Sequence, residues 1–367
     1  MGSSVSVFLC GDVMTGRGVD QILPHPSDPS LREDYVGDAR RYVELAEARN
    51  GAIARPVDYG WPWGDALDVL RERAPDVRVI NLETSITRSA DFAAGKAVHY
   101  RMSPDNMPCL TAAAPDVCAL ANNHVLDFGA EGLSDTLDAL ADARLQVAGA
   151  GREVTSAEAP AIVPFSDGRR VVVASCAMSS SGVPPSWVAT RHRPGIDLVA
   201  DLSARNADAI VDRIGSVLRA GDVAIVSVHW GTNWGYDVPA EHRRFAHRLV
   251  DGGVDVVHGH SSHHPRPIEI YRDRLILYGC GDFIDDYEGI SGYDRYRDDL
   301  RPMYLASLDG GRVTDLRIVV LQARRMRLQH APHADTAWLQ AVLDRVSRPF
   351  GTRANLNADG TISAQPS

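Results

Sequence analysis

The stretch GVDVVHGHSSHHP (253–265) carries four of the chain's 13 histidines, His258, His260, His263 and His264, directly after an apolar run. Neutral imidazoles bind metal ions and transfer protons near neutral pH, although a single histidine is more often an ordinary packed side chain. Four of them together predict that the segment after this strand contributes to a metal site or a proton-transfer site. That prediction depends on what the other strands bring to the same place.

Five further apolar runs also end in polar residues, so the pattern repeats along the chain. They are VSVFLC (5–10) before GD, VRVINL (77–82) before Glu83, DVCALA (116–121) before NNH, DVAIVSV (222–228) before HWG, and LILYGC (275–280) before GDF. Helical periodicity lies between several of them, at Leu133–Ala143, Asn206–Ala220 and His242–Asp251. This order is typical of layered α/β sheets, whose ligands bind beyond the carboxyl ends of the strands. We therefore expect all six polar motifs at one rim.

Oxygen and nitrogen donors follow these strands, at Asp12, Glu83, Asn123, His229 and His260. Each alone is more often a cap or a turn residue, but five donors arriving from separate strand ends are typical of a metal site. The set contains no thiolate, which disfavours a closed structural zinc site. We expect a catalytic site with one or two divalent ions, Mn, Fe, Zn, Mg or Ca.

The motifs together resemble a known family. They are GDVMTGR (11–17), NLE (81–83), NNHVLDFG (122–129), HWG (229–231), GHSSHHP (259–265) and YGCGDF (278–283). In this order they resemble the CapA family, named for a protein of poly-γ-glutamate capsule synthesis and related in fold to the metallophosphatases. The resemblance implies an α/β fold, a layered metallophosphatase-like (calcineurin-like) β-sandwich flanked by helices, with the metal site at the strand C-terminal ends.

The resemblance also implies roles for individual residues. Asp12 binds one metal, Glu83 bridges the two metals, and the other metal is bound by Asn123, His229 and His260. His124 matches the proton-donating histidine of metallophosphatases, with Asp127 as its orienting partner, and His258 or His263 supplies a further ligand or proton-transfer group. One departure is that Asp12-Val13-Met14 replaces the usual Asp-x-His, so a single tight metal, or a second one held weakly, is expected.

Three functions compete at this stage. In the first, the metal activates water for hydrolysis of a phosphoester or a γ-glutamyl amide bond. In the second, it polarises a carbonyl while two groups among His124, His258, His263 and Cys10 remove and return an α-proton. The sequence is similar to the CapA-like epimerase of lasso-peptide biosynthesis, which makes inversion of the C-terminal tryptophan of a ribosomal precursor peptide the favoured reaction. The third is a non-catalytic component of a polymer-synthesis complex, which would predict degraded motifs.

Substrate-binding residues are also expected. Arg17, close behind Asp12, is a candidate for a peptide's terminal carboxylate. Trp230 follows His229, and Trp61 and Trp63 end the long excursion 20–65, which we expect to carry short helices or to form a lid over the rim.

Composition sets the remaining expectations. A formal net charge of -10 argues against a nucleic-acid partner. The opening MGSSVSVFLCGD lacks a basic leader and no apolar run reaches membrane-spanning length, so we expect a cytoplasmic protein without a membrane partner. The five cysteines lack paired spacing and predict no disulfides. We expect one domain over 1–350 and a frayed polar tail over 351–367, whereas the oligomeric state stays open.

Overall fold

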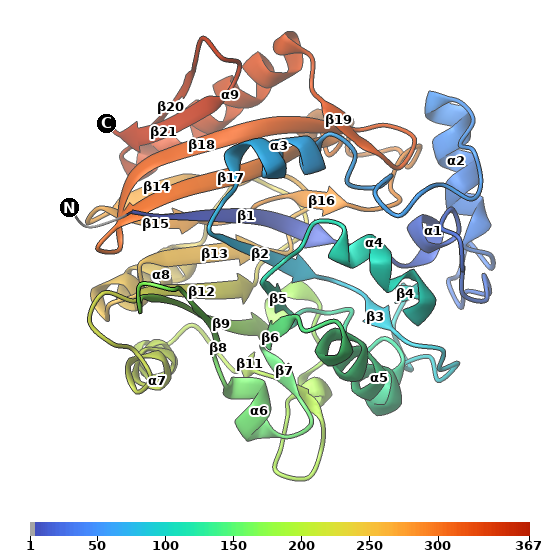
Figure 1. Cartoon of the computed structure of the whole chain (residues 1–367), viewed down its shortest axis with the longest axis horizontal. Helices are drawn as coiled ribbons and strands as arrows, with labels where there is room; N and C mark the ends of the chain where they lie inside the picture. The colour runs from blue at the N-terminus through green and yellow to red at the C-terminus, as the bar shows by residue number, and fades with distance from the viewer. Residues whose placement is uncertain (1–3) are drawn as a thin grey trace.

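Two large β-sheets dominate the computed structural model, which describes residues 4–367 (Figure 1). The ten-stranded sheet contains, in order, β20 (Thr352–Leu356), β21 (Ile362–Pro366), β18 (Arg312–Ala323), β17 (Leu300–Asp309), β1 (Val5–Val13), β2 (Val77–Leu82), β5 (Val117–Ala119) and β6 (Gln146–Ala148), with β16 (Asp282–Ile284) beside β1 and β19 (Leu328–His330) beside β18. The seven-stranded sheet contains β11 (Leu198–Val199), β9 (Arg170–Met178), β12 (Val223–His229), β13 (Val256–His260), β15 (Arg274–Leu277) and β14 (Ile268–Tyr271), with β8 (Ala161–Pro164) beside β9.

Short strands and helices complete the described part of the chain. Two small pairs are β3 (Ser85–Ile86) with β4 (Arg101–Met102), and β7 (Ala150–Gly151) with β10 (Gly195–Ile196). The helices are α1 (Arg17–Asp20), α2 (Arg40–Asn50), α3 (Ala66–Arg73), α4 (Met107–Thr111), α5 (Gly129–Asp142), α6 (Val154–Glu158), α7 (Ala204–Gly215), α8 (Ala240–Asp251) and α9 (His333–Ser347). The mixed α/β class expected from the sequence is confirmed.

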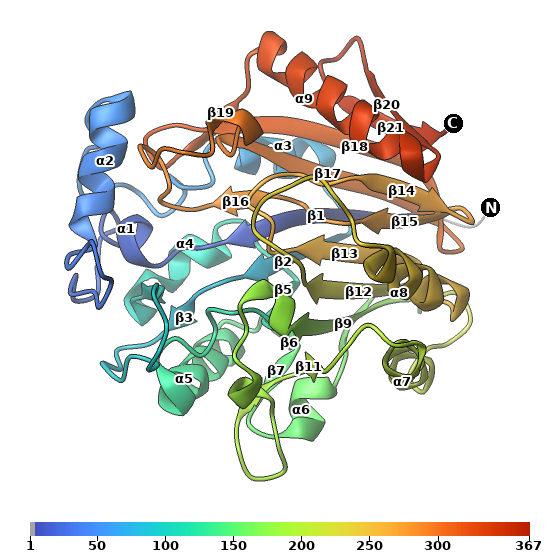
Figure 2. The ribbon, with the colours of Figure 1, turned by 180° about the vertical axis from the view of Figure 1, so that it is seen from behind.

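The two sheets pack face to face because their central strands are apolar on both faces, as parallel strands covered on both sides must be. Val7, Leu9 and Val79 of the ten-stranded sheet share one buried cluster with Val173 and Ile225 of the seven-stranded sheet. Strands β1, β2 and β5 are parallel to one another, as are β9, β12 and β13. In Figures 1 and 2 the arrows of both sets point the same way, so their carboxyl ends lie at one rim.

Helices cover the outer faces of the two sheets. Leu70 of α3, Leu110 of α4 and Leu133 of α5 pack against Ile80 in the ten-stranded sheet. On the other side, seen in Figure 2, α7 and α8 cover the seven-stranded sheet through residues such as Phe245. The molecule is therefore layered helix, sheet, sheet, helix. Among residues 4–367, no helix is both long and apolar enough to cross a membrane.

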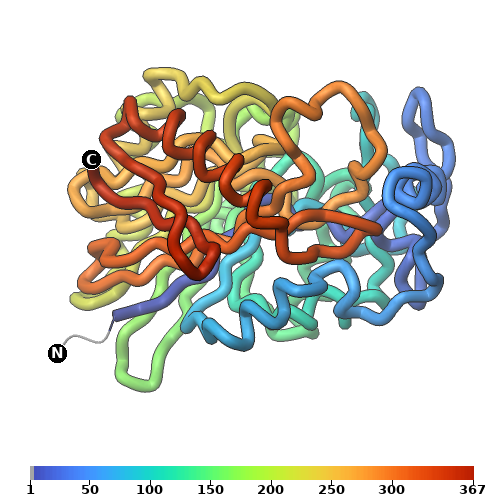
Figure 3. The backbone as a smooth tube through the Cα atoms, turned by 90° about the horizontal axis from the view of Figure 1, so that it is seen from above, coloured from blue at the N-terminus to red at the C-terminus, as the bar shows by residue number. Residues whose placement is uncertain are grey.

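The expected frayed tail is wrong. Residues 352–366 form the hairpin β20–β21, which pairs with β18 and lies beside α9 (Figure 3). Alternate side chains, Thr352 and Ala354 on one strand and Ile362 and Ala364 on the other, are buried and fix the register. Most polar residues of this segment occupy the solvent-facing positions of the two strands. The polar composition therefore hid the alternation of buried and exposed side chains that is typical of a strand.

Two further expectations change in the structure. Two of the four histidines of the 253–265 stretch lie in a strand, since β13 runs to His260, and only His263 and His264 lie in the following loop. The excursion 20–65 contains α2, as expected. Several of its side chains, such as Val43 and Val57, are buried in the hydrophobic core. The expected strand over 5–10 also extends to Val13, which places Asp12 within β1.

Candidate metal and proton-transfer site

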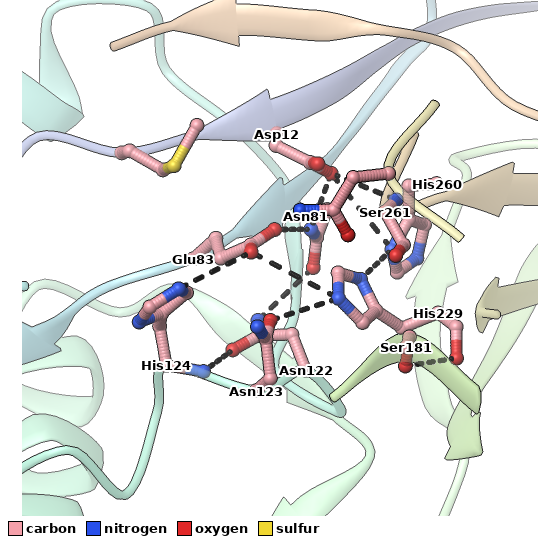
Figure 4. A network of polar contacts seen from close by, with 12 residues as sticks. Asp12, Asn81, Glu83, Asn122, Asn123, His124, Ser181, His229, His260 and Ser261 are labelled. Carbon is pink, nitrogen blue, oxygen red and sulfur yellow. Dashed lines mark hydrogen bonds and ion pairs between the residues drawn. The ribbon is translucent and has the colours of Figure 1, made fainter. Parts of the chain in front are cut away.

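Donor side chains from both sheets meet at the rim (Figure 4). Asp12 lies in β1, Glu83 follows β2, and Asn123 follows β5. His229 and His260 are the last residues of β12 and β13 and lie side by side in register. The five residues expected as metal ligands therefore converge from five different strand ends.

One group of ligand atoms combines the two sheets. Single ligand atoms of Asp12, His229 and His260 all lie within 4.8 Å of one another, and the three side chains are buried. Asp12 Oδ2 is buried and has no hydrogen-bond partner in the described chain. Burial and the nearby charge of Asp282 raise the pKa of Asp12. A carboxylate with an orphaned buried oxygen beside two neutral imidazoles fits a divalent cation.

A second group shares Asp12 with His263, one of the two histidines expected to supply a further ligand, and with Asp282, which the sequence did not indicate as a ligand. Ligand atoms of Asp12, His263 and Asp282 also lie within 4.8 Å of one another. His263 Nδ1 is 2.9 Å from Asp282 Oδ1, and Asp282 Oδ2 forms an ion pair with the buried Arg301 Nη1 at 3.3 Å. His263 and Asp282 therefore offer the donors that the absent Asp-x-His histidine would supply. This group also fits a cation.

A close backbone approach holds Asp12 and Asp282 together. The amide N–H of Asp12 donates to the carbonyl oxygen of Gly281 at 3.2 Å, and Asp12 pairs in register with Asp282. A Cβ atom at Gly11 would lie 1.5 Å from that same carbonyl oxygen. Only glycine allows this contact. The two Gly-Asp motifs of the sequence, GDV and GDF, therefore meet directly, which was the available signal for Asp282.

Glu83 lies between the metal groups and His124 but belongs to neither ligand set. Its Oε1 is 3.8 Å from His229 Nε2 and 3.9 Å from His124 Nε2. Asn81 donates its amide N–H groups to Asp12 Oδ1 and Glu83 Oε2, each at 2.8 Å. Burial and the charge of Asp12 raise the pKa of Glu83. Asn81 thus fixes two carboxylates at once, a role that its place in the NLE motif did not reveal.

Asn122 and Asn123 orient the neighbouring groups. The Asn122 side chain donates to Asn81 Oδ1 at 3.1 Å, which directs the Asn81 NH₂ group towards the carboxylates. Asn123 Oδ1 is 2.9 Å from His229 Nε2. Asn123 therefore lies beside the first group, where the sequence placed it.

His124 is held between a carboxylate and a lysine. Its Nδ1 is 2.6 Å from Asp127 Oδ2, so Nδ1 carries the hydrogen and Nε2 faces Glu83. Lys96 donates to Asp127 Oδ1 at 2.5 Å and to the backbone oxygen of Asn123. Burial lowers the pKa of His124 to about 4. Sequence reasoning missed Lys96, although it is the only lysine in the chain.

A pocket opens onto these groups. It has a volume of about 220 Å³ and is lined by Glu83, Lys96, Ala97, Val98, Asn123, His124, His229, Asn233, Ser261, His263 and Tyr287. Both His124 and His263 face it, and each has a carboxylate partner. The pocket is smaller than a typical site for a drug-sized ligand, so it accommodates one small group of a larger molecule.

Two of the expected proton-transfer residues face elsewhere. His258 Nε2 lies 2.7 Å from the carbonyl oxygen of Cys10, behind His260. Cys10 is fully buried, and burial raises the pKa of its thiol. Neither side chain lines the pocket. Cys10 belongs to the apolar cluster beneath α3, α4 and α5, and His258 is buried against Ser227 and the Cys10 carbonyl. All five cysteines are free and buried.

Arg17 is engaged by the protein itself. Its guanidinium makes two hydrogen bonds to Asp286, 2.8 Å from Nε to Oδ2 and 2.5 Å from Nη2 to Oδ1. A third contact, at 3.0 Å, goes to Glu33, and the ring of Tyr42 lies 3.6 Å from Cζ. Arg17 is 4% exposed, so it cannot receive a substrate carboxylate. It joins the loops after β1 and β16.

The three tryptophans expected near a substrate also pack within the protein. Trp230 stacks on His242 at 4.9 Å between ring centroids and donates to the carbonyl oxygen of Tyr278. Trp63 is fully buried. Trp61 is half-buried, and its indole donates to the carbonyl oxygen of Arg325. Each indole N–H donates to a backbone carbonyl that is far away in the sequence, so no local sequence pattern reveals the contact.

Comparison with known proteins adds four findings. A family model described as bacterial capsule synthesis protein PGA_cap matches residues 6–287. A probable polyglutamine synthesis accessory protein of Mycobacterium tuberculosis is 54% identical over 365 residues, covering 99% of this chain and 96% of that protein. The PGA biosynthesis protein CapA of Bacillus subtilis is 28% identical over 310 residues, 83% of this chain and 76% of that protein. A crystal structure of TT1561 of Thermus thermophilus aligns over 84% of this chain and all of that chain at 8% identity and a TM-score of 0.39.

Proposed function

The chain belongs to the bacterial capsule synthesis protein PGA_cap family, and from this membership we propose that it is a metal-dependent hydrolase acting on a glutamate-containing polymer or its precursor. The relatives carry names of glutamate-polymer or glutamine-polymer synthesis. One observation carries the enzymatic part of the proposal. Asp12 is shared by two buried ligand groups that adjoin the His124–Asp127 pair at one pocket.

The resemblance to metallophosphatases supports hydrolysis as the reaction class. A divalent cation held by these groups would supply a Lewis acid and lower the pKa of a coordinated water. The two groups differ in their donors. The pair of imidazoles with Asp12 favours Zn or Fe, whereas the carboxylate-rich group with His263 and Asp282 favours Mn or Mg.

The protein's own residues supply the remaining chemistry. Asp127 holds the Nδ1–H of His124, so the Nε2 atom is left to exchange a proton with the leaving group. Asn81 keeps Asp12 and Glu83 fixed, which limits reorganisation during the reaction. The small pocket admits the scissile group while the rest of the polymer stays outside.

Epimerisation of a peptide α-carbon is the second candidate, and one observation favours it. Two histidine–carboxylate pairs, His124 with Asp127 and His263 with Asp282, face the same pocket. Removal and return of an α-proton require two such groups. The C-terminal tryptophan of a precursor peptide remains a proposed substrate, but neither relative described above is named for that reaction.

One experiment separates the candidates. The metal-loaded protein is incubated in deuterated water with poly-γ-glutamate oligomers, with a tryptophan-terminated peptide and with a phosphomonoester, and the products are weighed by mass spectrometry. Shortened oligomers or released phosphate support the hydrolase. An uncleaved chain that gains one non-exchangeable deuterium supports the epimerase. A protein that binds metal and changes none of the three contradicts both enzymatic proposals and favours a binding role.

A further inference from the structure

Lys96 is exceptional in this chain because every other basic side chain is an arginine. The sequence has 38 lysines and arginines, and Lys96 is the only lysine. It lies in the irregular segment between β3 and β4, yet its side chain is only 11% exposed. The single lysine side chain therefore lines the pocket of the candidate site.

The surrounding acceptors explain the use of an ammonium group. Lys96 Nζ donates to Asp127 Oδ1 and to the backbone oxygen of Asn123, two acceptors that lie in different directions. The ring of Trp187 lies 5.0 Å from Nζ. A compact ammonium directs its three donors tetrahedrally, whereas the planar guanidinium of arginine serves acceptors in one plane.

A count of donors leaves one N–H of Lys96 for a ligand. Nζ is also 3.2 Å from His124 Nδ1, but that atom already donates its own hydrogen to Asp127 Oδ2 at 2.6 Å. Nδ1 therefore has no lone pair for Lys96. Asp127 and Asn123 use two N–H groups, which leaves the third without an oxygen acceptor in the described chain, on a side chain that lines the pocket.

The charges around the pocket indicate what this N–H binds. Glu83 is the carboxylate among the lining residues, and Lys96 is the one lysine or arginine among them. We propose that Lys96 binds an anionic oxygen group of the substrate, next to the bond that reacts. In a glutamate polymer this group is a carboxylate, and in a phosphoester it is a phosphoryl oxygen. The inference rests on the proposed function for the identity of the polymer, but the anion site can be tested without turnover.

The single lysine makes a direct binding test available. The full-length, metal-free protein is treated with succinimidyl acetate, and acetylation of Lys96 is followed by peptide mass spectrometry. N-acetylglutamate, inorganic phosphate and chloride are compared at matched ionic strength, with the α-amino group as an internal control. We expect saturable protection of Lys96 by an anion, with acetylation slowed by about tenfold while the α-amino group reacts at an unchanged rate.

The pattern of protection identifies the anion. Protection by N-acetylglutamate supports a carboxylate substrate, and protection by phosphate alone supports the anion site but places a phosphoryl group in it. Equal acetylation in all three salts overturns the inference, even if the protein later proves to be a hydrolase. Protection in a protein that turns over no polymer supports the anion site and contradicts the proposed function.

Variants give an independent measurement. Lys96→Gln should weaken the binding of the protecting anion by about tenfold in calorimetry, whereas Lys96→Arg should retain part of it. Arg88→Gln is the matched control, because it removes a positive charge from the same segment at an exposed pair with Asp105. In an active preparation, Lys96→Gln should raise KM more than it lowers kcat. Unchanged anion binding by a folded Lys96→Gln protein, checked by thermal unfolding, contradicts the assignment.

Discussion

His258 donates its Nε2–H to the carbonyl oxygen of Cys10, 2.7 Å away. Its Nδ1 therefore carries a lone pair and accepts the hydroxyl hydrogen of Ser227 at 3.1 Å. The same hydroxyl oxygen then accepts the Nε2–H of His260 at 2.8 Å. These three hydrogen bonds leave the lone pair of His260 on Nδ1, 4.0 Å from Asp12 Oδ1.

Ser227→Ala should therefore weaken metal binding. Without the hydroxyl, His260 loses the acceptor that fixes its tautomer, and we expect the Kd for Zn²⁺ or Mn²⁺ to rise about tenfold or more in calorimetry. Ser175→Ala is the control. Ser175 pairs in register with Ser227 on the next strand, and its hydroxyl has no hydrogen-bond partner in the described chain. Equal affinities of the two variants would show that the tautomer is set elsewhere.

Asp12→Asn should abolish metal binding without loss of folding. Because burial raises the pKa of Asp12 above its unfolded value, the ionised carboxylate destabilises the metal-free fold at high pH. The amide removes that cost, so the metal-free variant should unfold at the same or a higher temperature at pH 8. The gain should shrink as the pH falls below about 7 and disappear below the unfolded pKa of 3.8. Asp68→Asn, on the exposed face of α3, is the control. Metal bound by Asp12→Asn at the wild-type level, measured by elemental analysis, would refute the shared-ligand assignment.

His124→Ala should keep metal but lose turnover. The imidazole lies outside both ligand groups, yet its Nε2 faces the pocket. A positioned proton-transfer group contributes about 10²–10⁴-fold to a rate. Metal content and activity measured on one preparation test this prediction. A parallel fall of both would make His124 a ligand instead.

Arg17→Met should destabilise the fold instead of weakening substrate binding. The change leaves Asp286 buried without its bidentate partner, and such a loss costs about 3–5 kcal/mol in the free energy of unfolding. Urea unfolding gives this value. The double variant Arg17→Met, Asp286→Leu should recover much of the loss. A stable single variant with a raised KM would return Arg17 to the substrate.

Ile362→Ala should lower the free energy of unfolding by about 2–5 kcal/mol, because Ile362 is fully buried where the hairpin pairs with β18. Ile290→Ala, at a side chain that is 42% exposed, should change it by less than about 0.5 kcal/mol. Chemical unfolding of both variants provides the comparison. Equal small effects would mean that the C-terminal hairpin contributes little to the sheet.

The sequence predicted the parts of the molecule that depend on local pattern. The six short apolar runs became strands that are buried in the core, and parallel pairing then brought Asp12 and His260 to one rim. Arg17 could not be placed, since its partner Asp286 is 269 residues away. Trp63 was a candidate for substrate binding, because the segments that bury it lie far away in the sequence.

Two site residues could not be identified from the sequence for a related reason. Asp282 follows a glycine in a short motif, so it looked like a turn residue until pairing with β1 set it beside Asp12. Lys96 lies in a segment without periodicity, and only its uniqueness among the basic residues marked it. A count of residue types can therefore direct attention to a position that periodicity misses.

The placement of Asp12 in one sheet, and of His229 and His260 in the other, gives the cation a mechanical consequence. An ion bound by all three residues would link the two sheets of the sandwich at one end. At a free concentration a hundred times its Kd, such an ion would add about 2.7 kcal/mol to the resistance to unfolding. Chelation should then loosen the rim first, and amide hydrogen exchange at the ends of β1, β12 and β13 should quicken before it does in the middle of either sheet.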